Sequence, residues 1–353
     1  MILPIVSIFL PIIFGAILLV WPEKNEEKKL SLKTLSIYTG GVLLISLAFI
    51  LLSVFTAKEE TFNLFRMTDS IVLSFKVDSL GRLFATVMGI VWVCVGFYSF
   101  EYMKHEKNQK RYFGIYIMVL GILMGLCFAG NVVTYYAFYE LMTLGSFGMV
   151  LHNQSHEAVM AGLKYLFYSF AGAYMVLFGI YFVYQYSVDS SMAFAEGGMI
   201  DLALATSKGA LSMMGNYASG GVLSVAMLLM IVGFSVKAGM FPMHGWLPTA
   251  HPVAPAPASS ALSAIIVKSG VLGIIRVIYF VFGEDMFAGS YVQKTVLVLS
   301  LITVFIGSML AYGEKVLKKR LAYSTVSQVS YILFGIFMII AERADDAGAG
   351  ATG

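Results

Sequence analysis

The stretch Gly233–Gly270 decides the fold: GFSVKAGMFPMHGWLPTAHPVAPAPASSALSAIIVKSG. Two lysines, Lys237 and Lys268, stand in otherwise apolar surroundings, and most of the prolines of the chain lie between them: Pro242, Pro248, Pro252, Pro255 and Pro257. Proline inside a helix removes a backbone donor and clashes with the preceding turn. We therefore expect a membrane helix that breaks within residues 233–257, just after Lys237, followed by a second helix that carries Lys268.

The composition indicates a polytopic membrane protein. The chain has 353 residues, of which 59% are hydrophobic and 12% charged, and its mean hydropathy is +0.84. Soluble proteins carry about 25% charged residues. The N-terminal segment lacks a basic start and a cleavage pattern, which favours an uncleaved first helix. Cys94 and Cys127 lie in apolar runs, which predicts buried hydrophobic side chains and no disulfide framework.

We predict an all-α fold with about ten transmembrane helices, since a span takes about 20 residues. Thr61–Val77 alternates polar and apolar residues, which predicts a β-hairpin or an interfacial segment. Ser187–Gly220 is expected to be a surface loop that can hold a short helix. The expected spans are Ile2–Trp21, Leu35–Phe55, Leu80–Phe100, Phe113–Gly130, Val132–Leu151, Ala158–Tyr186, Gly221–Trp246, Ala258–Phe282, Lys294–Tyr312 and Leu321–Ala341.

Basic residues predict the orientation, because Lys and Arg gather in cytoplasmic loops. One set of loops holds Lys24, Lys28, Lys29, Lys33, Lys104, Lys107, Lys110, Arg111, Lys315, Lys318, Lys319 and Arg320. The opposite loops hold fewer basic residues and most of the acids, Asp69 and Asp78 among them. The first set is therefore expected in the cytoplasm, with both termini outside.

Charged residues at membrane depth are candidate functional groups, since each costs about 2.5–3.5 kcal/mol on insertion scales. We expect Glu140 and Lys237 to face each other as a pair that opens and closes, because a nearby carboxylate holds a lysine charged. Lys164 and Lys268 extend the proton path, and His244 and His251 are candidate proton relays.

Structural alternatives stay open for each of these groups. Glu140 and Lys237 can form a static ion pair, and Lys164 can extend to the membrane surface from a helix start. His244 and His251 can serve packing alone. We expect Arg82 and Arg276 near helix ends, and three further histidines solvated in cytoplasmic loops: His105, His152 and His156.

Other chemistries lack their motifs. The sequence has no phosphate-binding GxxxxGK[ST] loop, no cysteine cluster for iron–sulfur, no intramembrane histidine pair for haem and no dinucleotide fingerprint. We expect no catalytic or redox centre, cofactor, metal or nucleic acid partner in this chain.

Five segments resemble the antiporter-like subunits of the respiratory complex I superfamily: YELMTL around Glu140, LKYLFYS around Lys164, the KAGMFPMHGWLPTAHPVAPAPASSALS run from Lys237, IIVKSG around Lys268 and LKKRLAYSTVSQVSYILFGI from Leu317. The likeness is greatest to Mrp D, hydrogenase-type and middle complex I members. It implies that Glu140 and Lys237 form the charge switch and that Lys164 and Lys268 are the linking lysines. The family is built from two inverted five-helix repeats.

Against this family pattern, we expect N-terminal helices in 1–112, a complete repeat in 113–283, two helices of an incomplete second repeat in 284–341 and a polar tail in 342–353. The second broken helix is missing, so another chain supplies it or the reading frame is truncated. Gln328 stands where many relatives have histidine; it can bind water but cannot titrate.

The resemblance implies a proton-translocating subunit of a redox-driven respiratory or hydrogenase-type complex in a prokaryotic inner membrane. The expected partners are other membrane subunits, another antiporter-like subunit and a peripheral redox module. Two alternatives remain: a subunit of an Mrp-type sodium/proton antiporter, and a scaffold that conducts nothing.

Overall fold

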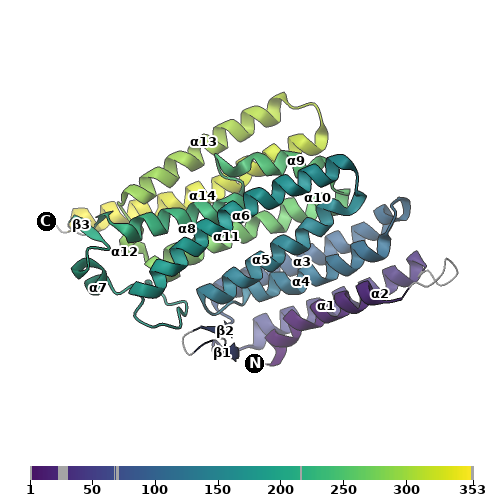
Figure 1. Cartoon of the computed structure of the whole chain (residues 1–353), viewed down its shortest axis with the longest axis horizontal. Helices are drawn as coiled ribbons and strands as arrows, with labels where there is room; N and C mark the ends of the chain where they lie inside the picture. The colour runs from purple at the N-terminus through teal and green to yellow at the C-terminus, as the bar shows by residue number, and fades with distance from the viewer. Residues whose placement is uncertain (1, 23–30, 67, 69–70, 215–216, 351–353) are drawn as a thin grey trace.

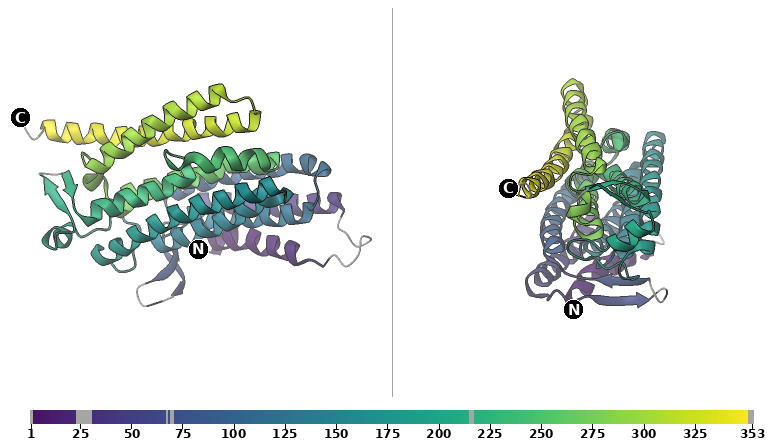
Figure 2. Two further views of the ribbon diagram at one scale, coloured as in Figure 1. Left: turned by 45° about the horizontal axis from the view of Figure 1, so that its top comes forward. Right: turned by 90° about the vertical axis from the view of Figure 1, so that its left-hand side faces the viewer.

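A computed structural model describes residues 2–22, 31–66, 68, 71–214 and 217–350; at 212–214, 217–219 and 341–350 it describes the backbone alone. The long helices run roughly side by side, with α13 and α14 at one edge of the bundle and α1 and α2 at the opposite edge (Figures 1 and 2). Helix α1 packs on α4, α6 on α8 and α13 on α14.

The first half of the chain contains, in order, α1 (Ile2–Val20), α2 (Leu32–Thr56), β1 (Phe62–Arg66), β2 (Val72–Phe75), α3 (Ser79–Tyr102), η2 (Met103–His105), α4 (Gln109–Cys127), α5 (Val132–Val150), η3 (Leu151–Asn153) and α6 (His156–Tyr186). The second half contains α7 (Leu202–Ser207), β3 (Ser212–Met214), β4 (Tyr217–Gly220), α8 (Val222–Ala238), η4 (Met243–Trp246), α9 (Leu247–Val253), α10 (Ala256–Ala261), η5 (Leu262–Ile266), α11 (Val267–Arg276), η6 (Val277–Phe282), α12 (Glu284–Phe287), α13 (Tyr291–Gly313) and α14 (Leu317–Gly350).

The all-α membrane architecture predicted from composition is confirmed. Nine candidate spans in the described residues are long and apolar enough to cross a membrane. The tenth predicted span is α5, which has 19 residues like α1 but does not reach the same hydropathy, because Glu140 and several threonine and tyrosine side chains lie in it. Large apolar side chains are exposed along the outer helices, for example Phe167 at 71% and Phe305 at 67%, as a lipid-facing surface requires.

The two connecting regions follow their predictions. Strands β1 and β2 form an antiparallel hairpin within Thr61–Val77. The segment Ser187–Gly220 holds the short helix α7 and a second two-stranded hairpin, β3–β4. Both hairpins and both chain ends lie at the same end of the bundle (Figure 1). Among the residues used for the orientation, Lys24, Lys28, Lys29 and Asp69 lie outside the described residues.

Asp78 and Arg276 correct two expectations. Asp78 was predicted as a loop acid and Arg276 as a residue near a helix end, but the two form a buried ion pair, and the Arg276 side chain is only 1% exposed. One Asp78 oxygen accepts from Arg276 at 2.9 Å and also caps α3 by accepting from the Gly81 N–H at 2.8 Å. The guanidinium lies over the rings of Phe194 and Phe280, at 4.8 and 5.0 Å from their centroids. This pair therefore fixes α11 to the start of α3 and to the 187–220 segment.

Three smaller expectations also change. Arg82 does lie near a helix end, where its guanidinium donates to the last carbonyls of α2, Val54 at 3.0 Å and Ala57 at 2.6 Å. His152, expected in solvent, is buried against the Tyr112 ring at a centroid distance of 5.4 Å. Cys94 is exposed on the outer face of α3, whereas Cys127 is buried as predicted.

Candidate functional site

The predicted break lies directly after Lys237. Helix α8 ends at Ala238, and Gly239 closes it in the left-handed conformation with φ 77° and ψ 28°. Such a φ favours glycine, which has no Cβ to clash with the backbone. The Phe241 N–H, freed by the break, donates to the Thr303 hydroxyl of α13 at 2.8 Å. A membrane helix tolerates a break only where protein satisfies the freed groups, and Thr303 does so here.

The five prolines have different roles around this break. Pro242 lies in the turn between α8 and η4, and Pro255 lies in the gap between α9 and α10. Pro248 and Pro257 stand at the first turns of α9 and α10, where a missing N–H is tolerated, and Pro252 lies inside α9. The proline-rich crossing is thus two short helices with breaks on either side.

Lys237 is fully buried, with 0% of its surface exposed. Its amine donates to the hydroxyls of Tyr165 and Ser169 on α6, at 2.9 Å in the case of Ser169. Aromatic rings surround the same amine: Tyr165 lies 4.0 Å from it, Trp246 5.8 Å and Tyr139 5.9 Å. The pocket therefore offers hydroxyl oxygens and ring faces to the lysine.

Two glycines allow α6 to approach α8 closely enough for these contacts. A Cβ added at Gly172 would lie 2.7 Å from the Gly233 carbonyl oxygen, and one at Gly233 would lie 2.6 Å from that of Gly172. On the other side, a Cβ at Gly270 of α11 would meet the Lys237 Cβ at 3.2 Å. The Lys237 backbone is thus held between two helices that contact it without intervening side chains.

Glu140 and Lys237 interact electrostatically, but they are not in ion-pair contact. The Glu140 oxygen Oε1 is buried and has no hydrogen-bond partner among the described residues. Tyr139, next to Glu140 on α5, points its ring to the lysine. The structure therefore shows the lysine bound by α6 and the carboxyl group with an unused acceptor, which is the open arrangement of the expected pair.

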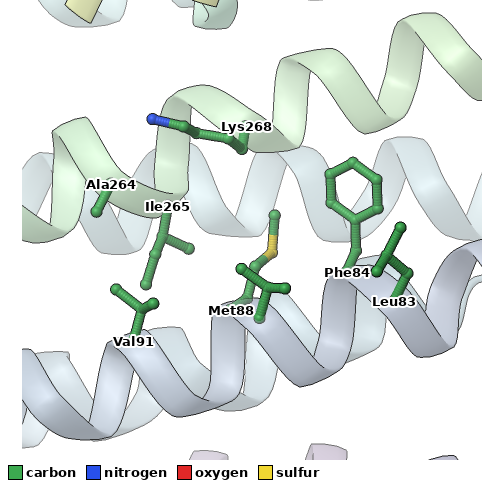
Figure 3. A pocket seen from close by; sticks show the side chains of 8 residues that line it. Leu83, Phe84, Met88, Val91, Ala264, Ile265 and Lys268 are labelled. Atoms are coloured by element: carbon green, nitrogen blue, oxygen red, sulfur yellow. The ribbon is translucent and has the colours of Figure 1, made fainter. Parts of the chain in front are cut away.

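Lys268 follows a π-helical turn, η5. Its amine donates to the Ser263 carbonyl at 2.7 Å, and the Ser263 hydroxyl lies 2.5 Å from that of Thr325 on α14. An apolar groove of about 220 Å³ between α3 and this region is lined by Phe84, Met88 and Ile265. Figure 3 shows the Lys268 side chain running along its own helix and away from α3. Lys268 is therefore held by its own helix, in the same turn that contacts α14.

Lys164 and His244 lie apart from the Lys237 pocket. Lys164 is exposed on α6, one position before Tyr165, which points inward. Its charge acts on His244, which is half-buried and stacks on Phe241 at 6.0 Å. His244 Nδ1 has no hydrogen-bond partner in the described part of the chain.

His251 lies at the turn between α9 and α10 and is 2% exposed. Its Nδ1 bonds the Ser259 hydroxyl at 2.8 Å, while its Nε2 has no hydrogen-bond partner among the residues described. The Lys318 amine donates to the nearby Ala254 carbonyl at 2.9 Å. Gln328, at mid-span of α14, is exposed on the outer surface of the bundle.

The sequence did not identify Tyr165, Ser169 or Thr303 as site residues. A signal for the first two was present, because residues four apart share one face of a helix, and Gly172 continues the same face. Thr303 gave no comparable signal, since nothing in α13 marks one hydroxyl as a partner of a distant backbone N–H. In the described residues, no group of three or more His, Cys, Asp or Glu side chains could hold a metal ion.

Comparisons with known proteins agree with this geometry. Residues 129–346 match a family model described as "NADH:quinone oxidoreductase/Mrp antiporter, TM", and residues 66–113 match one described as "NADH-Ubiquinone oxidoreductase (complex I), chain 5 N-terminus". The first match covers the break, Glu140 and all three lysines of the predicted path.

Three curated relatives come from different complexes. Hydrogenase-4 component B of Escherichia coli is 30% identical over 268 residues, which are 75% of this chain and 37% of that protein. The D-type protein of the Na(+)/H(+) antiporter of Bacillus subtilis is 24% identical over 94% of this chain and 63% of its own length. The M-type protein of the NADH-quinone oxidoreductase of Rickettsia bellii is 25% identical, with shares of 95% and 65%. The chain thus spans between 37% and 65% of the length of these relatives.

A solved structure shares the fold. A chain of the archaeal membrane-bound sulfane sulfur reductase, a respiratory membrane complex, superposes with a TM-score of 0.73 and 20% identity, covering 94% of this chain and 64% of that one. These relatives and this neighbour are subunits of multi-subunit membrane complexes.

Proposed function

Because the chain belongs to the NADH:quinone oxidoreductase/Mrp antiporter family of membrane proteins, we propose that it is a proton-translocating subunit of a redox-driven respiratory or hydrogenase-type complex. The observation that carries the proposal is Lys237, a fully buried amine at a helix break. Ionisable groups inside a membrane are functional by default, since their burial is costly.

The proposed switch is the approach and separation of Glu140 and Lys237. Glu140 keeps a buried, unbonded oxygen, and the two groups already interact electrostatically. When the carboxylate approaches, it holds the lysine charged; when it withdraws, the lysine can release its proton. Lys268, with His244 and His251, would continue the path. Lys164, exposed on α6, would serve at the rim of the path near His244.

We further propose a prokaryotic cytoplasmic membrane location with both termini outside. The end of the bundle that carries both termini and both hairpins would be external (Figure 1). The opposite end carries the basic loops after α3 and α13, as the positive-inside rule requires of cytoplasmic loops. A redox module and another antiporter-like subunit would be partners, and the division into 1–112, 113–283, 284–341 and 342–353 remains part of the proposal.

The test uses the intact complex purified from its native membrane and reconstituted in liposomes, with proton uptake followed by a pH-sensitive dye. Glu140→Gln and Lys237→Ala should each abolish uptake while the complex still assembles. Glu101→Gln and Lys104→Ala are matched controls, because this pair is an exposed ion pair at a helix end. Full uptake in either Glu140→Gln or Lys237→Ala would refute the proposal.

A sodium/proton antiporter is the second candidate, supported by the Bacillus subtilis antiporter relative that matches 94% of this chain. The proteins that co-purify distinguish the two: iron–sulfur subunits support the redox-driven complex, and small membrane subunits alone support the antiporter. A non-conducting scaffold would instead lose assembly, and not uptake, when the buried charges are removed.

A further inference from the structure

We propose that Tyr165 is a positioning residue for translocation: with Ser169 and Ser146, its hydroxyl holds Lys237 apart from Glu140 and accommodates the lysine both charged and neutral. This inference deepens the proposed function and rests on it. It assigns the second partner of the lysine, the one that competes with the carboxylate.

The contacts form a continuous chain of buried groups. The Lys237 amine donates to Tyr165 and, at 2.9 Å, to Ser169. The Tyr165 hydroxyl lies 2.6 Å from the Ser146 hydroxyl of α5. Tyr165, Ser169 and Ser146 are each at most 1% exposed. Helices α5, α6 and α8 thus meet at one phenol, and Glu140 lies on the same helix as Ser146.

The direction of the hydrogen bonds follows from the carbonyls nearby. The Ser146 hydroxyl lies 2.7 Å from the Met142 carbonyl and 3.2 Å from that of Thr143, neither of which can donate. Ser146 therefore donates to a carbonyl, and Tyr165 donates to Ser146. The Tyr165 oxygen keeps a lone pair for the ammonium group of Lys237.

The same atoms can also bind a neutral amine. A hydroxyl both donates and accepts, so turning the O–H of Tyr165 or Ser169 to the amine nitrogen supplies the donor that a neutral lysine needs. No heavy atom has to move. An ionised carboxylate only accepts, so Glu140 favours the charged lysine alone. Lys237 can therefore change its protonation state at Tyr165, whereas contact with Glu140 holds it charged.

Packing keeps the phenol in this position. The Trp246 ring lies against that of Tyr165, with centroids 4.7 Å apart and an angle of 48°. Trp246 is itself fixed, because its Nε1–H donates to the Val236 carbonyl at 2.7 Å. The Val236 carbonyl belongs to the last turn of α8, so the break and the tyrosine are held in register.

Titratable groups on the neighbouring elements must be considered before a pH profile is interpreted. On the helices around Lys237 they are Tyr139 and Glu140 on α5, Tyr165 on α6, His244 on η4 and Lys268 on α11. Among these groups, only Glu140 acts electrostatically on the lysine. A change in the pH profile after a Tyr165 substitution therefore reports on the balance between Tyr165 and Glu140.

The experiment compares Tyr165→Phe and Ser169→Ala with Tyr174→Phe in the reconstituted complex. Phenylalanine keeps the ring against Trp246 and removes only the hydroxyl; Tyr174 is a matched control, being 72% exposed on the same helix. Losing a hydrogen bond to a charged group changes an equilibrium by about ten- to a hundredfold. We expect uptake in Tyr165→Phe to fall by about that factor and its pH profile to move to higher pH, since Glu140 then holds the lysine charged. Ser169→Ala should show a smaller shift in the same direction.

An unchanged rate and pH profile in Tyr165→Phe would overturn the inference, as would an equal change in Tyr174→Phe. Glu140→Gln and Lys237→Ala, measured in the same preparation, separate the two failures. If both stop uptake while Tyr165→Phe behaves as wild type, only the role of Tyr165 is wrong. If they leave uptake intact, the proposed function itself is wrong. If Tyr165→Phe does not assemble, the Ser169→Ala profile decides, and an unshifted profile counts against the inference.

Discussion

Replacing Asp78 by asparagine should destabilise the folded chain by about 3–5 kcal/mol, the usual loss when one partner of a buried ion pair is removed. Asparagine is a good N-cap, so the hydrogen bond to Gly81 can persist and the change isolates the charge. Arg276 would remain 1% exposed between Phe194 and Phe280 with no counter-charge.

The partner substitution should cost less. Arg276→Met leaves the Asp78 carboxylate with the Gly81 N–H at 2.8 Å, and its side chain is 12% exposed, so water can reach it. The double variant removes both charges and should be more stable than Asp78→Asn alone. Asp78→Ala adds the loss of the cap, a further about 1 kcal/mol.

The measurement is the free energy of unfolding of the purified chain in mild detergent, obtained by denaturant titration. The Glu101→Gln and Lys104→Met variants serve as an exposed control pair and should each change stability by less than about 1 kcal/mol. The reasoning fails if Asp78→Asn lies within that range, or if the double variant loses as much as the sum of the two single changes.

Three other predictions concern single contacts. Gly233→Leu should separate α6 from α8 and stop uptake, because its Cβ would lie 2.6 Å from a backbone oxygen; Gly41→Leu, with nothing within 4 Å, is the control. Arg82→Met should lower the free energy of unfolding by about 1–3 kcal/mol, since two α2 carbonyls lose a charged donor. Burial, and next the charge of Arg111, lower the pKa of His152 from 6.5 to about 4. The unfolded chain therefore binds more protons between these values, so stability should fall as pH drops from 6.5 to 4, and His152→Gln should flatten this slope in unfolding titrations.

The sequence predicted the features that local chemistry controls. Proline and a lone lysine in an apolar run marked the break after Lys237, and alternation marked the hairpin at Thr61–Val77. Residues that depend on distant partners were not predictable. Asp78 and Arg276 are 198 positions apart, and each alone resembles an ordinary charge near a membrane surface.

The candidate site shows the same division. Lys237 and Glu140 were identified by their charge, but the partner of Lys237 depends on the rotation of α6, which the sequence leaves open. Lys164 and Tyr165 are neighbours in the chain, and the structure exposes the first and buries the second. Charge alone favoured Lys164, because a tyrosine in an aromatic-rich helix gives no signal of its own.

The hydrogen bond between Thr303 and the Phe241 N–H has a mechanical consequence. Helix α13 supplies the acceptor for the broken helix, so it cannot slide away without leaving a bare amide in the apolar layer, at a cost of several kcal/mol. Any force applied to α13 from outside the bundle is therefore transmitted to the turn that follows Lys237. Thr303→Val keeps the shape and deletes this tie, which would let the two parts shift independently.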